Sequence, residues 1–396
     1  MSVKLSVKNL YKIFGEQPQK AFPLLKKGLD KDEIFAQTGL TVGVNNVSLE
    51  INQGEIFVIM GLSGSGKSTL VRLLNRLIQP TKGHVYVGNR DVAAISDKEL
   101  RQVRRKSLSM VFQSFALMPH MNIIDNTAFG LELSGIPIEE RHQIALKALK
   151  RVGLEAYANV YPDELSGGMQ QRVGLARALA NDPEVLLMDE AFSALDPLIR
   201  SEMQDELLRL QEDDQRTIVF ISHDLDEAMK LGDRIAIMQN GKVIQVGRPD
   251  EILQNPINDY VSSFFQGVDV SNVLSVKDIA NRKYLLNIVQ KNTDEKPNIA
   301  LKLLENHDLD FAVVLNRYGQ YQGMVSLESL QKGVRSAKTL SECFIETILL
   351  EKEQLISSII TDITNAQHPL PVVDEKQRYY GVVTRVQVLK VLDKEV

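Results

Sequence analysis

The 396-residue sequence predicts an α/β fold with a parallel sheet, followed by a smaller α+β region that is duplicated. Over the first two thirds of the chain, short apolar runs alternate with helical stretches, which is typical of a parallel sheet covered on both faces. A glycine-rich loop, Gly61 to Ser68, separates one such run from a helix. Near the C-terminus, a strand–turn–strand–helix pattern occurs twice.

The elements before the glycine-rich loop follow from residue alternation. Leu5 to Leu10 alternates as a strand does, and Asn46 to Ile51 does so again before a turn at Asn52–Glu55. Between them, residues from about 15 to 44 are rich in Lys, Asp, Glu, Gln and Gly and have a weak helical period, so we expect an inserted helical element. Ile56 to Met60 is apolar throughout and predicts a buried strand.

After the loop, the pattern becomes mainly helical and then returns to strands. We expect helices from Ser68 to about Ile78 and over most of residues 95–160, where residues 141–152 are amphipathic. We also expect a helix at 169–180, directly after a glycine pair, and buried strands at 185–188 and 217–221. Two further strands, at 234–238 and 242–246, should form a hairpin around Asn240-Gly241.

The composition changes after Gly267, where residues 268–300 are polar and weakly patterned. The repeat follows, and its glycines, Gly323 and Gly381, are 58 positions apart. Its first copy spans residues 311–315, 323–327 and 328–330, and its second spans 371–374, 381–384 and 386–392. We therefore predict two copies of one α+β module.

Composition excludes several classes of protein. Lys and Arg number 46 against 51 Asp and Glu, and this net charge of -5 argues against a dedicated nucleic-acid binder. Cys343 is the single cysteine, so we expect a reducing compartment and a small buried side chain. No apolar run approaches the roughly 20 residues of a spanning helix, and we expect no signal peptide.

The glycine-rich loop has the sequence of a phosphate-binding loop, G-x-x-x-x-G-K-[ST], and lies between a strand and a helix as that function requires. Glycines let backbone N–H groups turn inward around phosphate oxygens, and the helix N-terminus adds partial positive charge. Lys67 would reach the β- and γ-phosphates, and the Ser68 hydroxyl would hold Mg²⁺. The expected nucleotide contacts are Gly61, Leu62, Ser63, Gly64, Ser65, Gly66, Lys67, Ser68 and Thr69.

Two carboxylates end the apolar run at 185–188. Because parallel strands deliver their carboxyl ends to the ligand crevice, Asp189 would bind Mg²⁺ and Glu190 would accept a proton from the attacking water. Apolar strands often end in Asp or Glu without such a role. Together with the phosphate loop, however, the pair indicates phosphoryl transfer.

The octet Leu165 to Arg172 contains Ser-Gly-Gly before a helical run, which generically is an N-cap with a flexible turn. It also resembles the signature motif of ATP-binding cassette (ABC) ATPases. Gln113 resembles the Q-loop glutamine of that family, Ser193 to Asp196 its D-loop, and His223 its switch histidine, all in the family's order. The resemblance covers about residues 3 to 265.

The resemblance implies a RecA-like core with a β-subdomain and a helical subdomain at about 114–175, in an ATPase domain of residues 1–267. It implies that ATP and Mg²⁺ bind between two copies of the chain, with each ATP between one phosphate loop and the partner's signature segment. The implied catalytic residues are Glu190 as base, His223 at the γ-phosphate, and Gln113 at the metal or the water. Other implied contacts are Ser166, Gly167, Gly168 and Asp196 to nucleotide, and Ser68, Gln113 and Asp189 to metal.

Two further roles come from the same resemblance. An adenine-stacking aromatic is expected near the first strand, where Phe14 aligns best and Tyr11 second, although both could be core residues. The segment from Ser114 to Asn126 faces the membrane subunit in relatives. Its apolar side chains suit docking or could equally be core, and they are Phe115, Leu117, Met118 and Met121.

The long insert and the sequences at 104–106, 110–120 and 188–200 resemble the glycine betaine/proline betaine importer branch. The resemblance implies an ATPase on the cytoplasmic face of the membrane, acting with a permease and a substrate-binding protein and with no nucleic acid. The repeat is similar to tandem cystathionine-β-synthase (CBS) modules, at 268–335 and 336–396. These imply ionic-strength sensing, with dimerisation or nucleotide binding as alternatives.

Two other functions remain open at this point. The solute could differ, for example an amino acid, because nothing in such a subunit contacts it. Some cassette ATPases act in DNA repair or on ribosomes instead. Those usually carry two cassettes or a coiled-coil insertion, and neither is present in this sequence.

Overall fold

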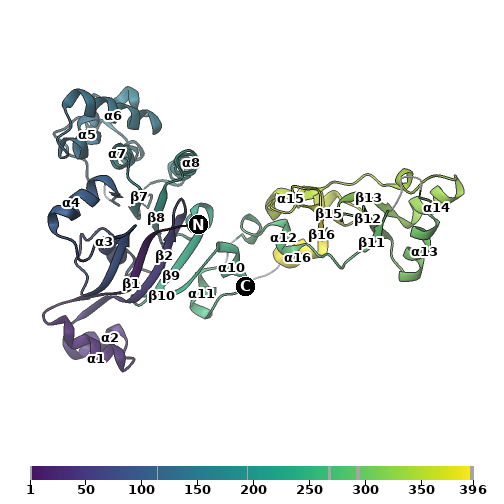
Figure 1. Ribbon diagram of the computed structural model, residues 1–396, viewed down its shortest axis with the longest axis horizontal. Coiled ribbons are helices and arrows are strands. Elements are labelled where there is room, and N and C mark those ends of the chain that lie inside the picture. The colour runs from purple at the N-terminus through teal and green to yellow at the C-terminus, as the bar shows by residue number, and fades with distance from the viewer. Residues whose placement is uncertain (1, 114, 194, 266–268, 291–294, 393–396) are drawn as a thin grey trace. The chain divides into compact units, whose positions relative to one another are not determined.

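A computed structural model describes residues 2–113, 115–193, 195–265, 269–290 and 295–392. The chain forms two compact units, Met1–Phe265 and Gln266–Val396 (Figure 1). The predicted domain limits at 267/268 fall on residues outside those described, so these limits stay predictions. Within the described ranges, no helix combines the length and the apolar character needed to cross a membrane.

A six-stranded sheet forms the centre of the first unit, with strand order β10-β9-β3-β8-β7-β6. All pairs are parallel except the β9–β10 hairpin, as predicted. The strands are β3 (Ile56–Met60), β6 (Leu108–Val111), β7 (Val185–Asp189), β8 (Thr217–Ser222), β9 (Arg234–Gln239) and β10 (Lys242–Gly247). Strand β6 was not predicted within the mainly helical 95–160 region, because four residues are too few to show a period.

A second, four-stranded antiparallel sheet has the order β2-β1-β4-β5. Its strands are β1 (Val3–Phe14), β2 (Thr41–Asn52), β4 (Lys82–Val87) and β5 (Arg90–Asp91). The predicted helical insert between β1 and β2 is present as η1 (Pro18–Lys20), α1 (Ala21–Lys26) and α2 (Lys31–Thr38). The insert packs Ala21 and Ile34 against Ile13 of β1, so it has a small core of its own.

The helices of the first unit mostly match the predicted ranges. Helix α3 ends at Leu74 instead of Ile78, because Arg76 adopts a left-handed conformation (φ 54°) that an α-helix does not allow. The others are α4 (Asp97–Lys106), α5 (Ile123–Glu132), α6 (Ile138–Arg151), α7 (Gly167–Ala180), α8 (Pro197–Asp214), α9 (Leu225–Leu231), α10 (Pro249–Gln254) and α11 (Asp259–Phe264). Short 3-10 turns occupy Glu155–Tyr157 and Pro162–Glu164.

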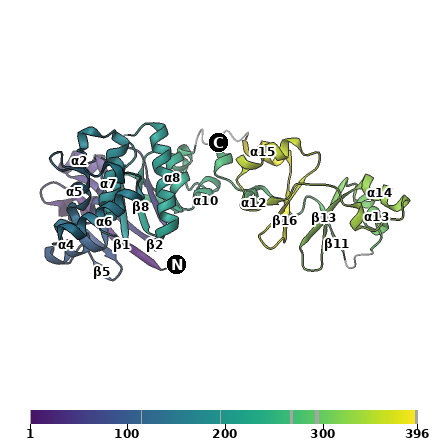
Figure 2. The ribbon, with the colours of Figure 1, turned by 90° about the horizontal axis from the view of Figure 1, so that it is seen from above.

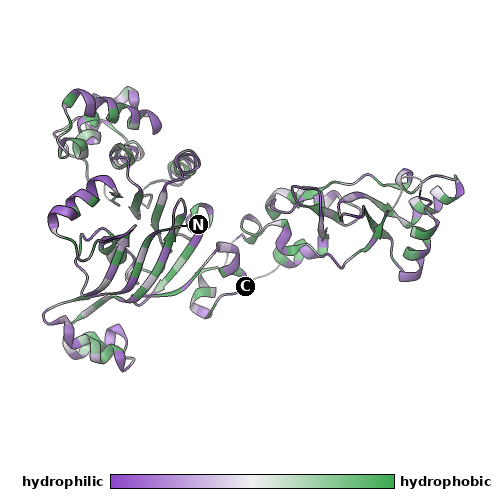
Figure 3. Ribbon diagram, in the orientation of Figure 1, coloured by the Kyte–Doolittle hydropathy of each residue, from purple (hydrophilic) through white to green (hydrophobic). Residues whose placement is uncertain are grey.

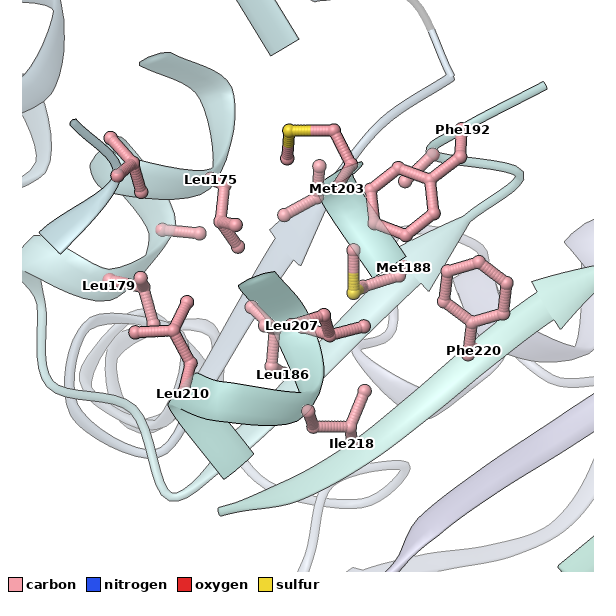
Figure 4. Packing of buried hydrophobic residues seen from close by; sticks show 14 of the residues in the cluster. Leu175, Leu179, Leu186, Met188, Phe192, Met203, Leu207, Leu210, Ile218 and Phe220 are labelled. Atoms are coloured by element: carbon pink, nitrogen blue, oxygen red, sulfur yellow. The ribbon is translucent and has the colours of Figure 1, made fainter. Parts of the chain in front are cut away.

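Helices α7 and α8 pack on β7 and β8 and bury the strand that carries the two carboxylates (Figure 4). The Phe192 and Phe220 rings lie 5.4 Å apart in this cluster, and Leu207 of α8 is buried in the same cluster. Removing such a buried leucine side chain typically costs about 2–5 kcal/mol. The colouring in Figure 3 shows the apolar strands of this sheet and the more polar surface of α4 and α6.

The second unit repeats one element order twice, strand–helix–strand–strand–helix (Figure 2). In each copy the first strand pair is parallel and the second antiparallel. The first copy is β11 (Leu286–Val289), α13 (Asn298–His307), β12 (Phe311–Leu315), β13 (Tyr321–Ser326) and α14 (Leu327–Arg335). The second is β14 (Leu350–Glu351), α15 (Ile356–Asn365), β15 (Leu370–Val373), β16 (Tyr379–Val383) and α16 (Arg385–Leu392). The first strand and helix of each copy were not predicted.

The two copies share a core, with Val313 and Met324 of one beside Tyr379 and Val382 of the other. The segment before β11 crosses to the second copy. It comprises η4 (Val270–Asn272) and α12 (Val276–Ile279), and it forms bridges from Ser275 to Leu355 and from Asn281 to Val382. After α14, η5 (Ser341–Cys343) buries the Cys343 thiol to 3% exposure, which confirms the expected buried cysteine.

Candidate active site

The phosphate loop, Gly61 to Ser68, joins β3 to α3 and needs glycine at defined positions. Gly61, Gly64 and Gly66 have φ angles of 153°, 75° and 103°, which other residues rarely adopt. A Cβ atom on Gly66 would lie 2.3 Å from the Gly43 carbonyl oxygen, and one on Gly61 would lie 2.3 Å from the Met238 carbonyl oxygen. The neighbouring strands therefore press on the loop so closely that a side chain cannot fit.

The Lys67 side chain is buried and folds back over the loop. Its Nζ donates to the carbonyl oxygens of Gly61 (2.8 Å) and Leu62 (3.3 Å). Burial lowers the pKa of Lys67, while the charges of Glu190 and Asp189 oppose that shift. The amine thus lies beside the predicted phosphate position and near both the predicted catalytic base, Glu190, and the predicted Mg²⁺ ligand, Asp189.

A buried polar atom in the loop fits the proposed anion. Ser65 is 4% exposed, and its Oγ has no hydrogen-bond partner among the residues that the structure describes. A buried hydroxyl left without a partner costs free energy, so a ligand that accepts a hydrogen bond from it would be favoured there. The loop therefore suits phosphate oxygens.

The two carboxylates at the end of β7 differ in environment. Asp189 is 3% exposed and forms an ion pair with Arg72 at 3.3 Å. The sequence analysis missed Arg72, although its position one helical turn after Ser68 in α3 could have indicated it. Glu190 adopts a left-handed backbone conformation (φ 48°), a strained geometry that concentrates at functional sites in proteins.

The other two predicted catalytic side chains, Gln113 and His223, approach the Glu190 carboxylate. The Gln113 Nε2 donates to Glu190 Oε2 at 3.3 Å, and His223 Nδ1 lies 3.8 Å from the same oxygen. Gln113 also donates to Ser193 Oγ at 3.3 Å, and Ser193 Oγ donates to the Glu190 carbonyl at 2.9 Å. A glutamine and a histidine from two separate loops therefore approach the Glu190 carboxylate, and Ser193 links Gln113 to the Glu190 backbone carbonyl.

Phe14 is the better placed of the two candidate adenine-stacking residues. It lies at the end of β1 with 37% of its surface exposed, and Lys12 Nζ lies 4.9 Å from its ring centre. A Cβ on Gly43 would meet both the Phe14 ring (2.8 Å) and Thr69 Cγ2 (3.2 Å), so the ring adjoins the helix after the phosphate loop. Tyr11 instead packs edge-on against Phe22, with ring centres 5.3 Å apart.

The signature segment, Ser166 to Gly168, lies at the start of α7. Ser166 Oγ accepts from the Met169 N–H as N-cap, at 3.4 Å. A Cβ on Gly168 would lie 2.5 Å from Ile199 Cγ2, so the Ile199 side chain of α8 would have to shift to admit one. Among the described residues, no hydrogen bond joins this segment to the phosphate loop. The signature segment and the phosphate loop are therefore two separate features of the first unit.

The predicted D-loop leads into α8, where exposed Asp196 is the N-cap and accepts from the Ile199 N–H at 3.1 Å. Ala194 in this loop and Ser114 in the Q-loop segment lie outside the described residues. Arg177 of α7 donates to the carbonyl oxygens of Phe115 (3.0 Å) and Ala116 (2.7 Å) and holds the start of that segment. The apolar side chains proposed for docking are half-buried: Phe115, Leu117, Met118 and Met121.

The oxygen atoms proposed for Mg²⁺ fit the preference of that ion. Ser68 offers a hydroxyl, Gln113 an amide oxygen and Asp189 a carboxylate, all hard donors. Within the described parts of the chain, no group of three or more His, Cys, Asp or Glu side chains could hold a metal. That is compatible with Mg²⁺, which usually takes one or two carboxylates and completes its shell with phosphate and water.

A parallel sheet with a phosphate loop after β3 and paired carboxylates after β7 defines a P-loop ATPase. A family model described as "ABC transporter" matches residues 44–193. The dimeric structure of the ATP-binding cassette MJ0796 bound to ADP and Pi is similar at a TM-score of 0.53 and 35% identity, covering 62% of this chain and 98% of that one.

Two relatives match along nearly their whole length. The chain is 58% identical over 396 residues to the glycine betaine/proline betaine transport system ATP-binding protein ProV of Salmonella typhimurium, covering 100% of this chain and 99% of that protein. It is 49% identical over 384 residues to the glycine betaine transport ATP-binding protein OpuAA of Bacillus subtilis, covering 97% and 91%. The chain belongs to the family of ABC transporter ATP-binding proteins, in its glycine betaine/proline betaine group.

Proposed function

We propose that this chain hydrolyses ATP to drive import of glycine betaine and proline betaine across the cytoplasmic membrane. The hydrolysis step is supported above all by the Glu190 carboxylate, which Gln113 and His223 both approach beside the phosphate loop. The solute is supported by full-length similarity to a glycine betaine/proline betaine transport protein. No observation on this chain favours a different solute or a role in DNA repair.

In the proposed reaction, the phosphate loop binds the β- and γ-phosphates with its N–H groups, and Lys67 moves from the Gly61 carbonyl to a phosphate oxygen. Phe14 stacks on the adenine. Glu190 accepts the proton of the attacking water, Gln113 orients that water, and His223 contacts the γ-phosphate. Mg²⁺, held by Ser68, Gln113 and Asp189, would neutralise charge on the phosphates.

The separation of the two anion-binding loops supports a dimer as the active form. One copy would hold ATP with its phosphate loop and the region of Asp196, and the signature segment of the other copy would close over that ATP. The dimer would thereby complete a site that neither copy encloses alone. We place the dimer on the cytoplasmic face of the membrane, bound to a permease that receives solute from a substrate-binding protein. The Q-loop segment held by Arg177 is the proposed permease contact.

The repeat in the second unit is proposed to be a tandem pair of CBS modules that adjust transport to ionic strength. The strand–helix–strand–strand–helix order of both copies and their shared core support a paired module. The proposed limits of the two modules are 268–335 and 336–396. Helix α12 belongs to the first range but packs on the second copy.

Reconstitution tests the function directly. The chain is purified with its permease and reconstituted in liposomes. It should hydrolyse ATP faster when the binding protein carries glycine betaine than when it carries an amino acid. Equal stimulation by both would contradict the proposed solute. Ending the chain near residue 268, after a unit with its own cores, should retain hydrolysis and abolish its salt dependence. An unchanged salt response would contradict the proposed regulation.

A further inference from the structure

The last helix of the first unit, α11, reaches the phosphate loop through one side chain. The Tyr260 hydroxyl donates to the Met238 carbonyl oxygen at 2.9 Å, and the Leu62 N–H donates to the Tyr260 oxygen at 3.5 Å. The Phe264 ring packs edge-on against Tyr260, with ring centres 5.1 Å apart. Tyr260 is half-buried, and burial raises the pKa of its phenol, so the hydroxyl stays protonated and able to donate at neutral pH.

The peptide group that Tyr260 meets also meets the loop lysine. The bond between Gly61 and Leu62 has its N–H directed to Tyr260 and its C=O directed to Lys67 Nζ, which lies 2.8 Å from the Gly61 oxygen. Because a peptide group is planar and rigid, its two hydrogen bonds change together when it rotates. Such chains of hydrogen bonds also polarise one another.

The Met238 carbonyl oxygen lies close to the same peptide. A Cβ on Gly61 would be only 2.3 Å from this oxygen, so the loop has little room on this side. The Tyr260 hydroxyl therefore contacts both the end of β9 and the first peptide of the loop. From Phe265, the chain continues directly into the second unit.

We propose that Tyr260 is a positioning residue for nucleotide binding, which orients the Gly61–Leu62 peptide and thereby couples α11 to the state of the phosphate loop. The inference rests on the proposed binding of ATP by this loop. When Lys67 leaves Gly61 for a phosphate, the peptide loses one of its two hydrogen bonds, and its contact with Tyr260 changes. Coupling of this kind is reciprocal: the factor by which bound ATP shifts the position of Tyr260 equals the factor by which a shift of Tyr260 changes the affinity for ATP.

The test compares Tyr260→Phe, which removes the hydroxyl and retains the ring, with Tyr86→Phe on the four-stranded sheet as matched control. In the full-length chain we expect the KM and Kd for ATP to rise about fivefold, as for the loss of one hydrogen bond, with kcat at saturating ATP unchanged. The Tyr86 variant should match the parent. A KM within 1.5-fold of the parent, or a fall in kcat at unchanged KM, would overturn the proposal.

A second readout uses the absence of tryptophan from the sequence. Phe264→Trp places the only tryptophan of the variant against Tyr260, and saturating ATP should shift the emission excited at the tryptophan band, whereas adding Tyr260→Phe should remove the shift. In the unsubstituted chain, ATP should also change amide hydrogen exchange in Asp259–Phe264. If ATP binds but neither signal changes, the coupling is wrong. If the parent fails to bind ATP, the proposed function itself is wrong.

Discussion

The phosphate loop of the first unit and a cavity of the second unit carry opposite charge. The loop offers backbone N–H groups, a free buried hydroxyl and Lys67. The cavity in the second unit, about 920 Å³, is lined by four carboxylates and by no Lys or Arg among its described lining residues. These carboxylates are Asp310, Glu328, Glu346 and Asp362.

The difference separates the roles of the two units. Phosphates require positive charge or inward N–H groups, which the first unit supplies and the cavity does not. The cavity charge therefore argues against the alternative in which the two copies of the repeat, which we propose to be CBS modules, bind an adenine nucleotide in this cavity. We expect nucleotide chemistry in the first unit and none in this cavity.

The largest expected effect is on hydrolysis in the first unit. Glu190→Gln should lower steady-state ATP turnover at least a hundredfold, because a neutral amide cannot accept the proton, while ATP binding persists. Release of phosphate and binding of a fluorescent ATP analogue measure the two properties. Glu184→Gln is the control and should retain turnover, because the Glu184 side chain is exposed and lies at the opposite end of β7 from Glu190. Full turnover by Glu190→Gln would exclude it as the base.

The next effect concerns stability of the second unit alone. Gly323 and Gly381 occupy matching positions in the two copies, opposite Val314 and Val372. A Cβ on Gly323 would lie 2.4 Å from the Phe344 ring, and one on Gly381 would lie 3.0 Å from the backbone of Arg282. Each Ala variant should lower the free energy of unfolding of this unit by about 1–3 kcal/mol.

Urea titration followed by Cys343 exposure measures that loss, because the thiol is buried in the second unit. The KM for ATP should be unchanged in both variants. A rise in KM with no loss of stability would contradict the separation of roles between the units.

A smaller effect distinguishes the two aromatic candidates. Phe14→Ala should raise the Kd for ATP about tenfold through loss of base stacking, whereas Tyr11→Ala should leave the Kd within twofold. Equilibrium titration with ATP, and with inorganic triphosphate as a ligand without a base, checks the cause. If triphosphate binding weakens equally, Phe14 does not stack on adenine.

The smallest effect concerns the thiol of the second unit. Burial raises the pKa of Cys343, so less thiolate is present at any given pH and modification should be slower than for a free thiol. The rate should increase as the pH rises beyond the usual thiol range. Saturating ATP should change this rate less than twofold, since we place the nucleotide in the first unit. A rate equal to that of free cysteine would show that the thiol is not buried.

The sequence predicted the parallel sheet, the hairpin, the insert and the repeat because each has a period or a glycine signal long enough to read. Short strands escaped it. Strand β6 has four residues, and β14 has only Leu350 and Glu351, so pairing with a neighbouring strand creates them. The α3 end also differed, because one left-handed residue, Arg76, stops that helix.

For the site, the sequence by itself determined which side chains are proposed to carry the chemistry, since phosphate loops and paired carboxylates depend on residue type and local spacing. Only the tertiary structure decided which side chains meet. Gln113, Glu190 and His223 lie on three loops far apart in sequence, and parallel strands bring those loops to one edge of the sheet. The contacts of Arg72 with Asp189 and of Tyr260 with Leu62 are equally distant in sequence. Such contacts depend on how strands and helices pack, and no local pattern records that packing.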